Sequence, residues 1–102
     1  MRTMEAMDPV RFANALADAH RQQILRLLWG RELCVGDLVQ ALGLAQPTVS
    51  HHLRILRQAG LLRTRAAGRR MFYTLDLDAL DHGLRALRLA LRPSRRKGKR
   101  RG

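Results

Sequence analysis

The residues best suited to chemistry in this 102-residue chain lie in one stretch, from Gln46 to Gly60. Read as a helix, the stretch has a polar face that offers hydroxyl, amide, imidazole and guanidinium groups and no acid. The members of this face are Gln46, Thr48, Ser50, His51, Arg54 and Arg57. Such groups form hydrogen bonds with base edges and phosphates in the major groove of DNA. The alternative is an ordinary solvent-facing helix, but such faces usually mix glutamate with lysine and arginine. The stretch therefore favours contact with DNA.

The same stretch carries the signals that would hold this face in place. Val49, Leu53, Leu56 and Ala59 recur at i, i+4, i+7 and i+10. This spacing puts them on one side of a helix, where they can be buried together. Pro47 suits the first helical turn, and Gly60 suits the left-handed residue that follows a helix end. We therefore predict a helix that is buried along one side and ends before Gly60.

The charge of the chain points to the same class of partner. A net charge of +12 indicates a polyanion, with nucleic acid first and an anionic membrane surface second. Residues 92–102 hold seven basic residues and no acid, whereas residues 1–91 hold 13 basic and 8 acidic residues. We expect residues 1–8 to be a flexible N-terminus, residues 9–91 to form one domain, and residues 92–102 to be a disordered basic tail.

Several function classes are disfavoured by what the sequence lacks. It has no carboxylate pair, phosphate-binding loop or nucleophile–base constellation at recognisable spacing, so we expect neither an enzyme nor a cofactor. It has no apolar run of about 18 residues and no basic-then-apolar leader, so we expect neither a membrane span nor a signal peptide. The single cysteine excludes an internal disulfide and favours a reducing compartment. We therefore expect a cytoplasmic protein.

Three short helices are expected before the Gln46 stretch. Asp8 and Asp18 are suited to cap the first two of them. Residues 32–35 are too short for a helix and too apolar for a free loop, so we predict a bridge strand beside a later hairpin. A third helix then follows Cys34 and ends at the tight turn that begins with Gly43. Two short helices joined by such a turn form a helix-turn-helix.

A hairpin and a long helix are expected after the stretch. Residues 61–65 and 70–75 alternate at period two, and residues 66–69 separate them as a turn, which predicts a β-hairpin with arginines at its tip. The last helix runs through residues 77–91. Its leucine stripe consists of Leu77, Leu80, Leu84, Leu87 and Leu91. A helix face this apolar on a small domain is suited to pairing with a second chain. The alternative is that the helix folds back on the core of its own chain. We predict a homodimer.

This order of elements is that of a winged helix-turn-helix, and individual segments resemble the ArsR/SmtB family of repressors. Residues 15–18 and 21–28 are similar to the opening of that family, residues 32–38 to its third-helix segment, residues 48–53 and 56–61 to its recognition helix, and residues 68–73 to its wing. The resemblance covers residues 9–90. It implies a mainly α fold with a small β-hairpin that dimerises through its terminal helices.

The resemblance also implies a function and a set of contacting residues. The expected protein is a sequence-specific DNA-binding transcriptional repressor that acts as a homodimer on an imperfect palindrome. Carried over by position, the residues near the bases are Gln46, Thr48, Ser50 and His51. Those near phosphate or the flanking minor groove are Arg54, Arg69 and Arg70. The position of His52 is open, because its place in the helix can turn it towards the protein.

The usual effector sites of that family are incomplete in this sequence. Its arsenic-type site needs a Cys-x-Cys pair, but Gly36 stands where the second cysteine would follow Cys34, and soft metalloids need two or three thiolates. Asp78 and His82 match the first half of its zinc-type site, but no Asp, Glu, His or Cys follows His82. We therefore predict no metal at these sites, and an organic or thiol-reactive effector, or none, remains open.

Alternative functions follow from Cys34 and from the charge. Cys34 is either a buried small hydrophobe kept by packing or, with its thiolate favoured by a helix N-terminus and basic surroundings, the sensor of a thiol- or metal-responsive repressor. His20 is expected to be structural. The chain could also be a non-specific architectural DNA-binding protein, for which palindromic and scrambled DNA would bind equally well.

Overall fold

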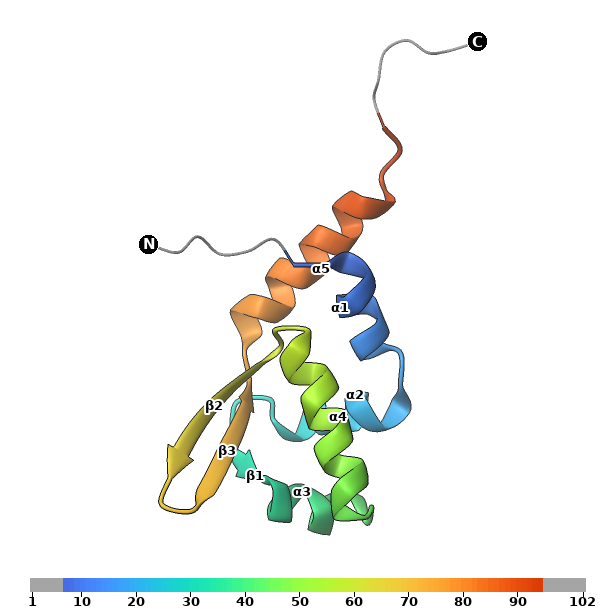
Figure 1. Ribbon diagram of the computed structural model, residues 1–102. Coiled ribbons are helices and arrows are strands. Elements are labelled where there is room, and N and C mark those ends of the chain that lie inside the picture. Colours follow the sequence, from blue (N-terminus) through green and yellow to red (C-terminus); the bar gives the residue numbers. More distant parts are fainter. Residues whose placement is uncertain (1–6, 95–102) are drawn as a thin grey trace, which may run out of the picture.

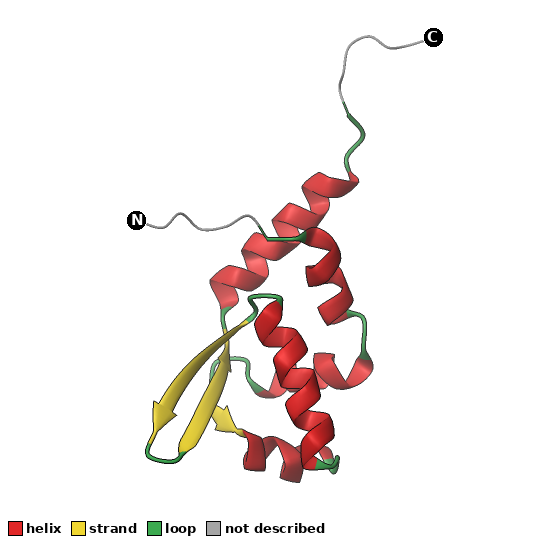
Figure 2. Ribbon diagram, in the orientation of Figure 1, coloured by secondary structure: helices red, strands yellow, loops and turns green. Residues whose placement is uncertain are grey.

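The computed structural model describes residues 7–94 as five helices and a small antiparallel sheet (Figure 1 and Figure 2). The helices are α1 (Pro9–Leu16), α2 (Ala19–Leu27), α3 (Val35–Leu42), α4 (Gln46–Gln58) and α5 (Leu77–Leu91). The strands are β1 (Leu33–Cys34), β2 (Leu62–Ala67) and β3 (Arg70–Leu75), in the order β1-β3-β2. The predicted fold class, mainly α with a small β-hairpin in winged helix-turn-helix order, is confirmed. Residues 1–6 and 95–102, on which most of the two expected flexible ends fall, lie outside the described residues.

The helix starts follow the capping residues that the sequence contains. The side chain of Asp8 accepts hydrogen bonds from the backbone of Val10 and Arg11, and that of Asp18 accepts one from the backbone N–H of Arg21 at 3.0 Å. Asp76 caps α5 in the same way through the N–H of Ala79. Each such cap typically stabilises a helix by about 1 kcal/mol. Within residues 7–94 no helix is both long and apolar enough to cross a membrane.

The core is built around the predicted apolar side of α4. Its four members, Val49, Leu53, Leu56 and Ala59, are all buried. They pack in one cluster with side chains from every other helix or its flanks, among them Phe12, Ile24, Leu28, Leu38 and Leu75. Burying each large apolar side chain contributes roughly 1.5–3 kcal/mol, so α4 is fixed by its inner side while its outer side remains free.

The hairpin differs from its prediction in the length of its turn. The strand pairing continues through Ala66 and Met71 to Ala67 and Arg70, which leaves only Gly68 and Arg69 as the loop. Gly68 has a φ of +61°, as the first residue of a two-residue type II′ turn requires. The predicted four-residue turn over 66–69 was therefore too long, because a glycine in this conformation lets the strands pair two residues further.

A glycine also sets the distance between the first and last helices. Gly83 of α5 is buried against the ring of Phe12 in α1. A Cβ atom added at Gly83 would lie 2.1 Å from the Phe12 Cε1 atom, far inside van der Waals contact. α1 can therefore cross α5 closely only because position 83 has no side chain. The two helices lie side by side in Figure 1.

A polar cluster is enclosed where α1, α2 and α4 meet. Arg21, which is buried, donates from Nε to the Ala15 carbonyl at 2.8 Å and from NH2 to the Asn14 carbonyl at 2.9 Å. Its third nitrogen, NH1, lies 3.3 Å from Nδ1 of His52, whose exposed fraction is 7%. A guanidinium can only donate, so Nδ1 of His52 accepts this hydrogen bond. His52 thus faces the protein, which settles the position that the sequence left open.

Burial has a direct effect on the protonation of His52. Desolvation of the ring lowers its pKa below the ordinary value of 6.5, and Asp18 opposes this shift while Arg21, His20 and His51 add to it. The folded protein therefore holds His52 in its neutral form at neutral pH.

The contact between Gly83 and Phe12 predicts that Gly83→Ala destabilises the fold. Overpacking a closed core costs roughly 1–3 kcal/mol, which outweighs the gain of about 1 kcal/mol in helix propensity. Gly36→Ala is the matched control, because the nearest atom to its added Cβ would be the Cys34 sulfur at 3.9 Å. Urea unfolding should show a lower midpoint for Gly83→Ala and an equal or higher one for Gly36→Ala. Equal midpoints for the two variants would contradict the close helix crossing.

The lowered pKa of His52 predicts a loss of stability in mild acid. The unfolded chain takes up a proton on this ring near pH 6.5, about the ordinary value, and the folded chain only at lower pH. Between those values unfolding binds protons, so the free energy of unfolding falls as the pH falls. Thermal unfolding followed by circular dichroism should give a Tm that declines from about pH 7 to about pH 5.

Two variants test whether His52 causes this decline. His52→Gln keeps an oxygen that can accept from Arg21 but does not titrate, so its Tm should depend less on pH. His82→Ala, on the exposed side of α5, should behave as the wild type. A wild-type slope that His52→Gln leaves unchanged would assign the effect to other groups.

Candidate nucleic-acid interface

The outer side of α4 presents the polar residues that the sequence singled out. Its five predicted contact residues, Gln46, Thr48, Ser50, His51 and Arg54, are all exposed. Gly43, with a φ of +69°, ends α3 and allows the short turn that leads into α4. The N-terminal end of α4 and the tip of the hairpin lie at the same end of the molecule (Figure 1). A recognition helix that enters the major groove contacts base edges with its N-terminal residues, so this placement suits that mode of binding.

His51 and Arg54 form a pair on this exposed side. The NH2 atom of Arg54 lies 3.1 Å from Nδ1 of His51. Because the guanidinium donates, Nδ1 accepts, and a neutral His51 ring then carries its proton on Nε2. His51 therefore presents a hydrogen-bond donor to its surroundings. Purine N7, guanine O6 and thymine O4 are the acceptors in the major groove that such a donor can contact.

The arginines of the hairpin fall into two groups that the sequence does not distinguish. Arg63 forms an ion pair with Asp76 at 3.2 Å, and Arg65 forms one with Glu32 at 2.8 Å. Among residues 7–94, neither Arg69 nor Arg70 has such an ion pair, and both are exposed at the hairpin tip. The two arginines that the sequence assigned to the wing contact therefore stand outside these ion pairs, although the charge of Arg70 contributes to the lowered pKa of Asp37.

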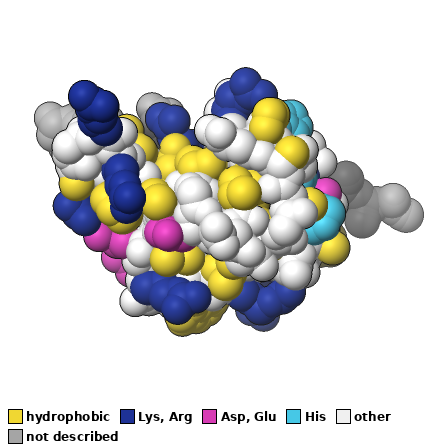
Figure 3. Space-filling model, turned by 90° about the horizontal axis from the view of Figure 1, so that it is seen from below, with side chains coloured by type: hydrophobic (Ala, Val, Ile, Leu, Met, Phe, Trp, Pro, Cys, Tyr) yellow, Lys and Arg dark blue, Asp and Glu magenta, His cyan; other side chains and the backbone are white. Residues whose placement is uncertain are grey.

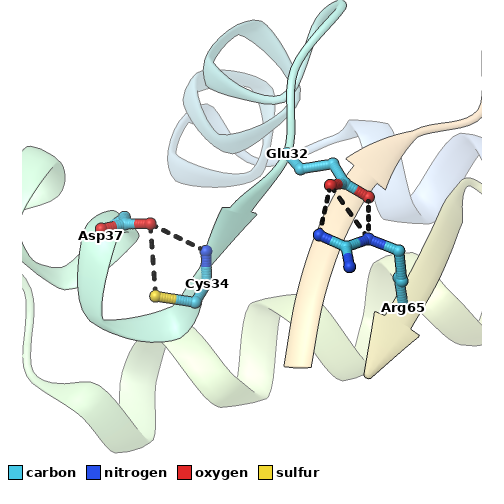
Figure 4. A network of polar contacts seen from close by, with 4 residues as sticks. All are labelled: Glu32, Cys34, Asp37 and Arg65. Atoms are coloured by element: carbon cyan, nitrogen blue, oxygen red, sulfur yellow. Dashed lines mark hydrogen bonds and ion pairs between the residues drawn. The ribbon is translucent and has the colours of Figure 1, made fainter. Parts of the chain in front are cut away.

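The Glu32–Arg65 pair braces the hairpin against the rest of the sheet (Figure 4). Both Nε and NH2 of Arg65 donate to the carboxylate of Glu32, and the guanidinium also lies 5.1 Å from the centre of the Phe72 ring. The hydrogen bonds from Arg65 lower the pKa of Glu32, so the carboxylate stays ionised through neutral pH. The pair joins the segment before β1 to β2 across the central strand β3.

The end of the molecule that carries α3 and the hairpin tip has few acids at its surface. Seen from this end, arginine side chains lie at several places around the edge, and acidic side chains show as smaller patches at the left, near the centre and at the right edge (Figure 3). No Asp or Glu occurs between Leu38 and Leu75, the segment that includes α4 and the hairpin. This distribution favours the approach of a polyanion from this side.

Cys34 is the N-cap residue of α3. The backbone N–H of Cys34 donates to the Asp37 carboxylate at 3.0 Å, and the thiol donates to the same oxygen at 3.2 Å (Figure 4). The hydrogen bond from the backbone of Cys34, joined by that from the thiol, lowers the pKa of Asp37. Cys34 is half-buried, which is intermediate between the packing and the sensor interpretations. Sensing through Cys34 stays a prediction.

The absence of metal at the two family sites stays a prediction. Asp78 and His82 are exposed on α5, and the described part of the chain after His82 offers no further oxygen, nitrogen or sulfur ligand of the usual kinds. What the sequence reasoning missed is the cluster around Arg21 and His52. Its only signal was the His51-His52 doublet, because neighbouring helix residues point about 100° apart and His52 can therefore face inwards while His51 faces outwards.

Comparisons with known proteins agree with this geometry. Residues 18–64 match the model of the family described as bacterial regulatory protein, arsR family. The chain is 42% identical over 83 residues to the HTH-type transcriptional regulator Rv2034 of Mycobacterium tuberculosis, a match that covers 81% of this chain and 74% of that protein. It is 41% identical over 71 residues to the transcriptional repressor SmtB homolog of Synechocystis sp., covering 70% of this chain but only 54% of the relative's length.

A solved structure extends the likeness to three dimensions. HlyU from Vibrio cholerae superposes with a TM-score of 0.65 at 37% identity, over 81% of this chain and 91% of that one. These relatives are named as transcriptional regulators, which are not enzymes. Sequence match, element order and superposition thus agree, and the recognition from sequence is confirmed: the chain belongs to the ArsR family of winged helix-turn-helix transcriptional regulators.

Proposed function

We propose that this DNA-binding transcriptional regulator acts as a homodimeric repressor on a palindromic operator. The observation that carries the proposal is the outer side of α4, which is polar, exposed and free of acids while its inner side is fixed in the core. One element thereby combines rigid placement with groups that can read base edges.

The contacts divide by their chemistry. Gln46, Thr48, Ser50 and His51 contact bases, and Arg54 contacts phosphate once it leaves His51. Arg69 and Arg70 at the wing tip contact the backbone or the minor groove beside the recognition site. The exposure of all seven residues supports this assignment, as does the absence of an ion pair at Arg69 and Arg70 within residues 7–94.

The proposal of a second subunit is supported by leucines on α5 that residues 7–94 leave exposed. Leu77, Leu84 and Leu91 are 40%, 46% and 76% exposed, and their spacing of seven residues puts them on one side of the helix. Val10 of α1 is 75% exposed as well. Leu80 and Leu87, by contrast, pack against the core of the same chain. A two-fold dimer through the uncovered side would present two α4 helices to two half-sites.

An architectural role without sequence preference is the second candidate, and the net charge of +12 favours it. The two roles differ in specificity. A regulator binds its operator at least about 10³-fold more tightly than random DNA, whereas an architectural protein binds both alike. The identity of an effector is a proposal for either role. One alternative is a thiol reagent that reacts with Cys34.

The assignment of base contacts predicts that Ser50→Ala and His51→Ala weaken operator binding selectively. Loss of one base contact costs about 1–3 kcal/mol, which is roughly 5- to 150-fold in affinity. Fluorescence anisotropy should show this loss on the DNA upstream of the gene and little change on a scrambled duplex. Gln58→Ala, an exposed polar residue at the far end of the same helix, is the control and should bind both as the wild type does. Equal losses on both duplexes would remove the base-reading role.

The uncovered leucines predict that charges on that side of α5 separate the subunits. The double substitution Leu84→Glu and Leu91→Glu removes two buried side chains, each worth about 1.5–3 kcal/mol, from the proposed interface. Sedimentation velocity should show monomers for this variant and dimers for the wild type. Leu89→Glu is the control, because Leu89 is exposed on the opposite side of the helix. A double variant that stays dimeric would place the interface elsewhere.

A further inference from the structure

Asp18, His20 and His52 form a cluster beside the recognition helix that the proposed DNA contacts do not use. Their ligand atoms, one from each residue, all lie within 4.8 Å of one another, and the two imidazole rings are 5.8 Å apart. His20 is exposed, Asp18 is half-buried and His52 is buried. The cluster is therefore closed on the side of the core and open to solvent on the other.

The three side chains are ligands of the kind that zinc and its neighbours prefer. Two imidazoles and one carboxylate suit Zn²⁺, Ni²⁺ or Cu²⁺. A zinc ion about 2.1 Å from each donor would hold the donors roughly 3.4 Å apart. Rotation of the exposed His20 and the half-buried Asp18 can provide this contraction. One oxygen of Asp18 caps α2 through the backbone of Arg21, which leaves the other oxygen for a metal.

Arg21 determines what a metal would do to His52. In the metal-free protein Nδ1 of His52 accepts a hydrogen bond from Arg21, so the neutral ring carries its proton on Nε2. A metal on Nδ1 takes the place of Arg21. A metal on Nε2 moves the proton to Nδ1, where it opposes the donor of Arg21. In both cases metal binding breaks the Arg21–His52 hydrogen bond.

This hydrogen bond joins the recognition helix to the corner between α1 and α2. Arg21 keeps its hydrogen bonds to Ala15 and Asn14 when it loses His52, so it stays in place and its positive charge weakens the metal site without closing it. α4, in contrast, loses its bond to Arg21 at His52, which lies within about one helical turn of the base-reading residues Thr48, Ser50 and His51. Metal binding to the cluster therefore removes a hydrogen bond that holds α4, and with it the residues that contact DNA, in position.

We propose that Asp18, His20 and His52 bind one divalent transition-metal ion such as Zn²⁺, and that this ion displaces Arg21 from His52 and so weakens operator binding. The proposal of a metal site depends only on the positions of these three side chains. Its effect on DNA rests on the proposed function.

The metal site is tested without DNA by competition between the full chain and a chromophoric zinc chelator. The wild type should bind one Zn²⁺ per chain, and His20→Ala and Asp18→Asn should each bind at least about tenfold more weakly. Asparagine keeps the cap of α2, so Asp18→Asn removes the charged ligand without removing the helix start. His82→Ala, which leaves the cluster intact, should bind as the wild type. No competition by the wild type, or a loss confined to His82→Ala, would overturn the site.

The coupling is tested by fluorescence anisotropy on the upstream DNA, with a chelator and with saturating Zn²⁺. Zinc should lower the operator affinity of the wild type, while His20→Ala should match the metal-free wild type and not respond to zinc. By linkage, operator DNA should lower zinc affinity by the same factor. An operator affinity that zinc leaves unchanged would overturn the coupling. Absence of specific DNA binding even with the chelator would instead refute the proposed function, and the chelator competition would still decide the metal site.

Discussion

The arrangement of the helices depends on how one buried guanidinium is bonded. Arg21 donates to the carbonyl groups of Asn14 and Ala15 in the last turn of α1, where Asn14 also accepts from the backbone N–H of the cap residue Ala17. Gln22 does the same for Leu16. The remaining nitrogen of Arg21 contacts His52 in α4. A buried charge is tolerated only when its hydrogen bonds are satisfied, so the end of α1, the start of α2 and the recognition helix must keep this mutual position.

The parts of the fold that could be predicted are those that local chemistry determines. The apolar spacing of Val49, Leu53 and Leu56, the caps at Asp8 and Asp18, and the leucine repeat of α5 each depend on residues within a few turns of one another. The burial of Arg21 could not be predicted in this way, because arginine is usually exposed and its partner His52 is 31 residues away. The same reason explains the wing. Arg63, Arg65, Arg69 and Arg70 look alike until the fold brings Asp76 and Glu32 beside the first two.

α5 combines two tasks on adjacent sides. Leu80, Gly83 and Leu87 face α1 and the core of the same chain, whereas Leu77, Leu84 and Leu91 are exposed in the described part of the chain. A stripe that looked like a single coiled-coil seam in the sequence is therefore divided between intramolecular packing and a free surface. Two alternatives were considered for this helix. Leu80 and Leu87 fold back on the core of the same chain, whereas Leu77, Leu84 and Leu91 are available to pair with a second chain.

The contact between Gly83 and Phe12 has a consequence beyond this chain. Position 83 lacks a side chain because a full aromatic ring from position 12 occupies the space. In relatives that keep the same helix crossing, a larger residue at 83 therefore requires a smaller one at 12, so the two positions should covary. Members that break this rule must carry α1 further from α5. We expect the pair to indicate, from sequence alone, how closely a member of the ArsR family packs its first helix against its last.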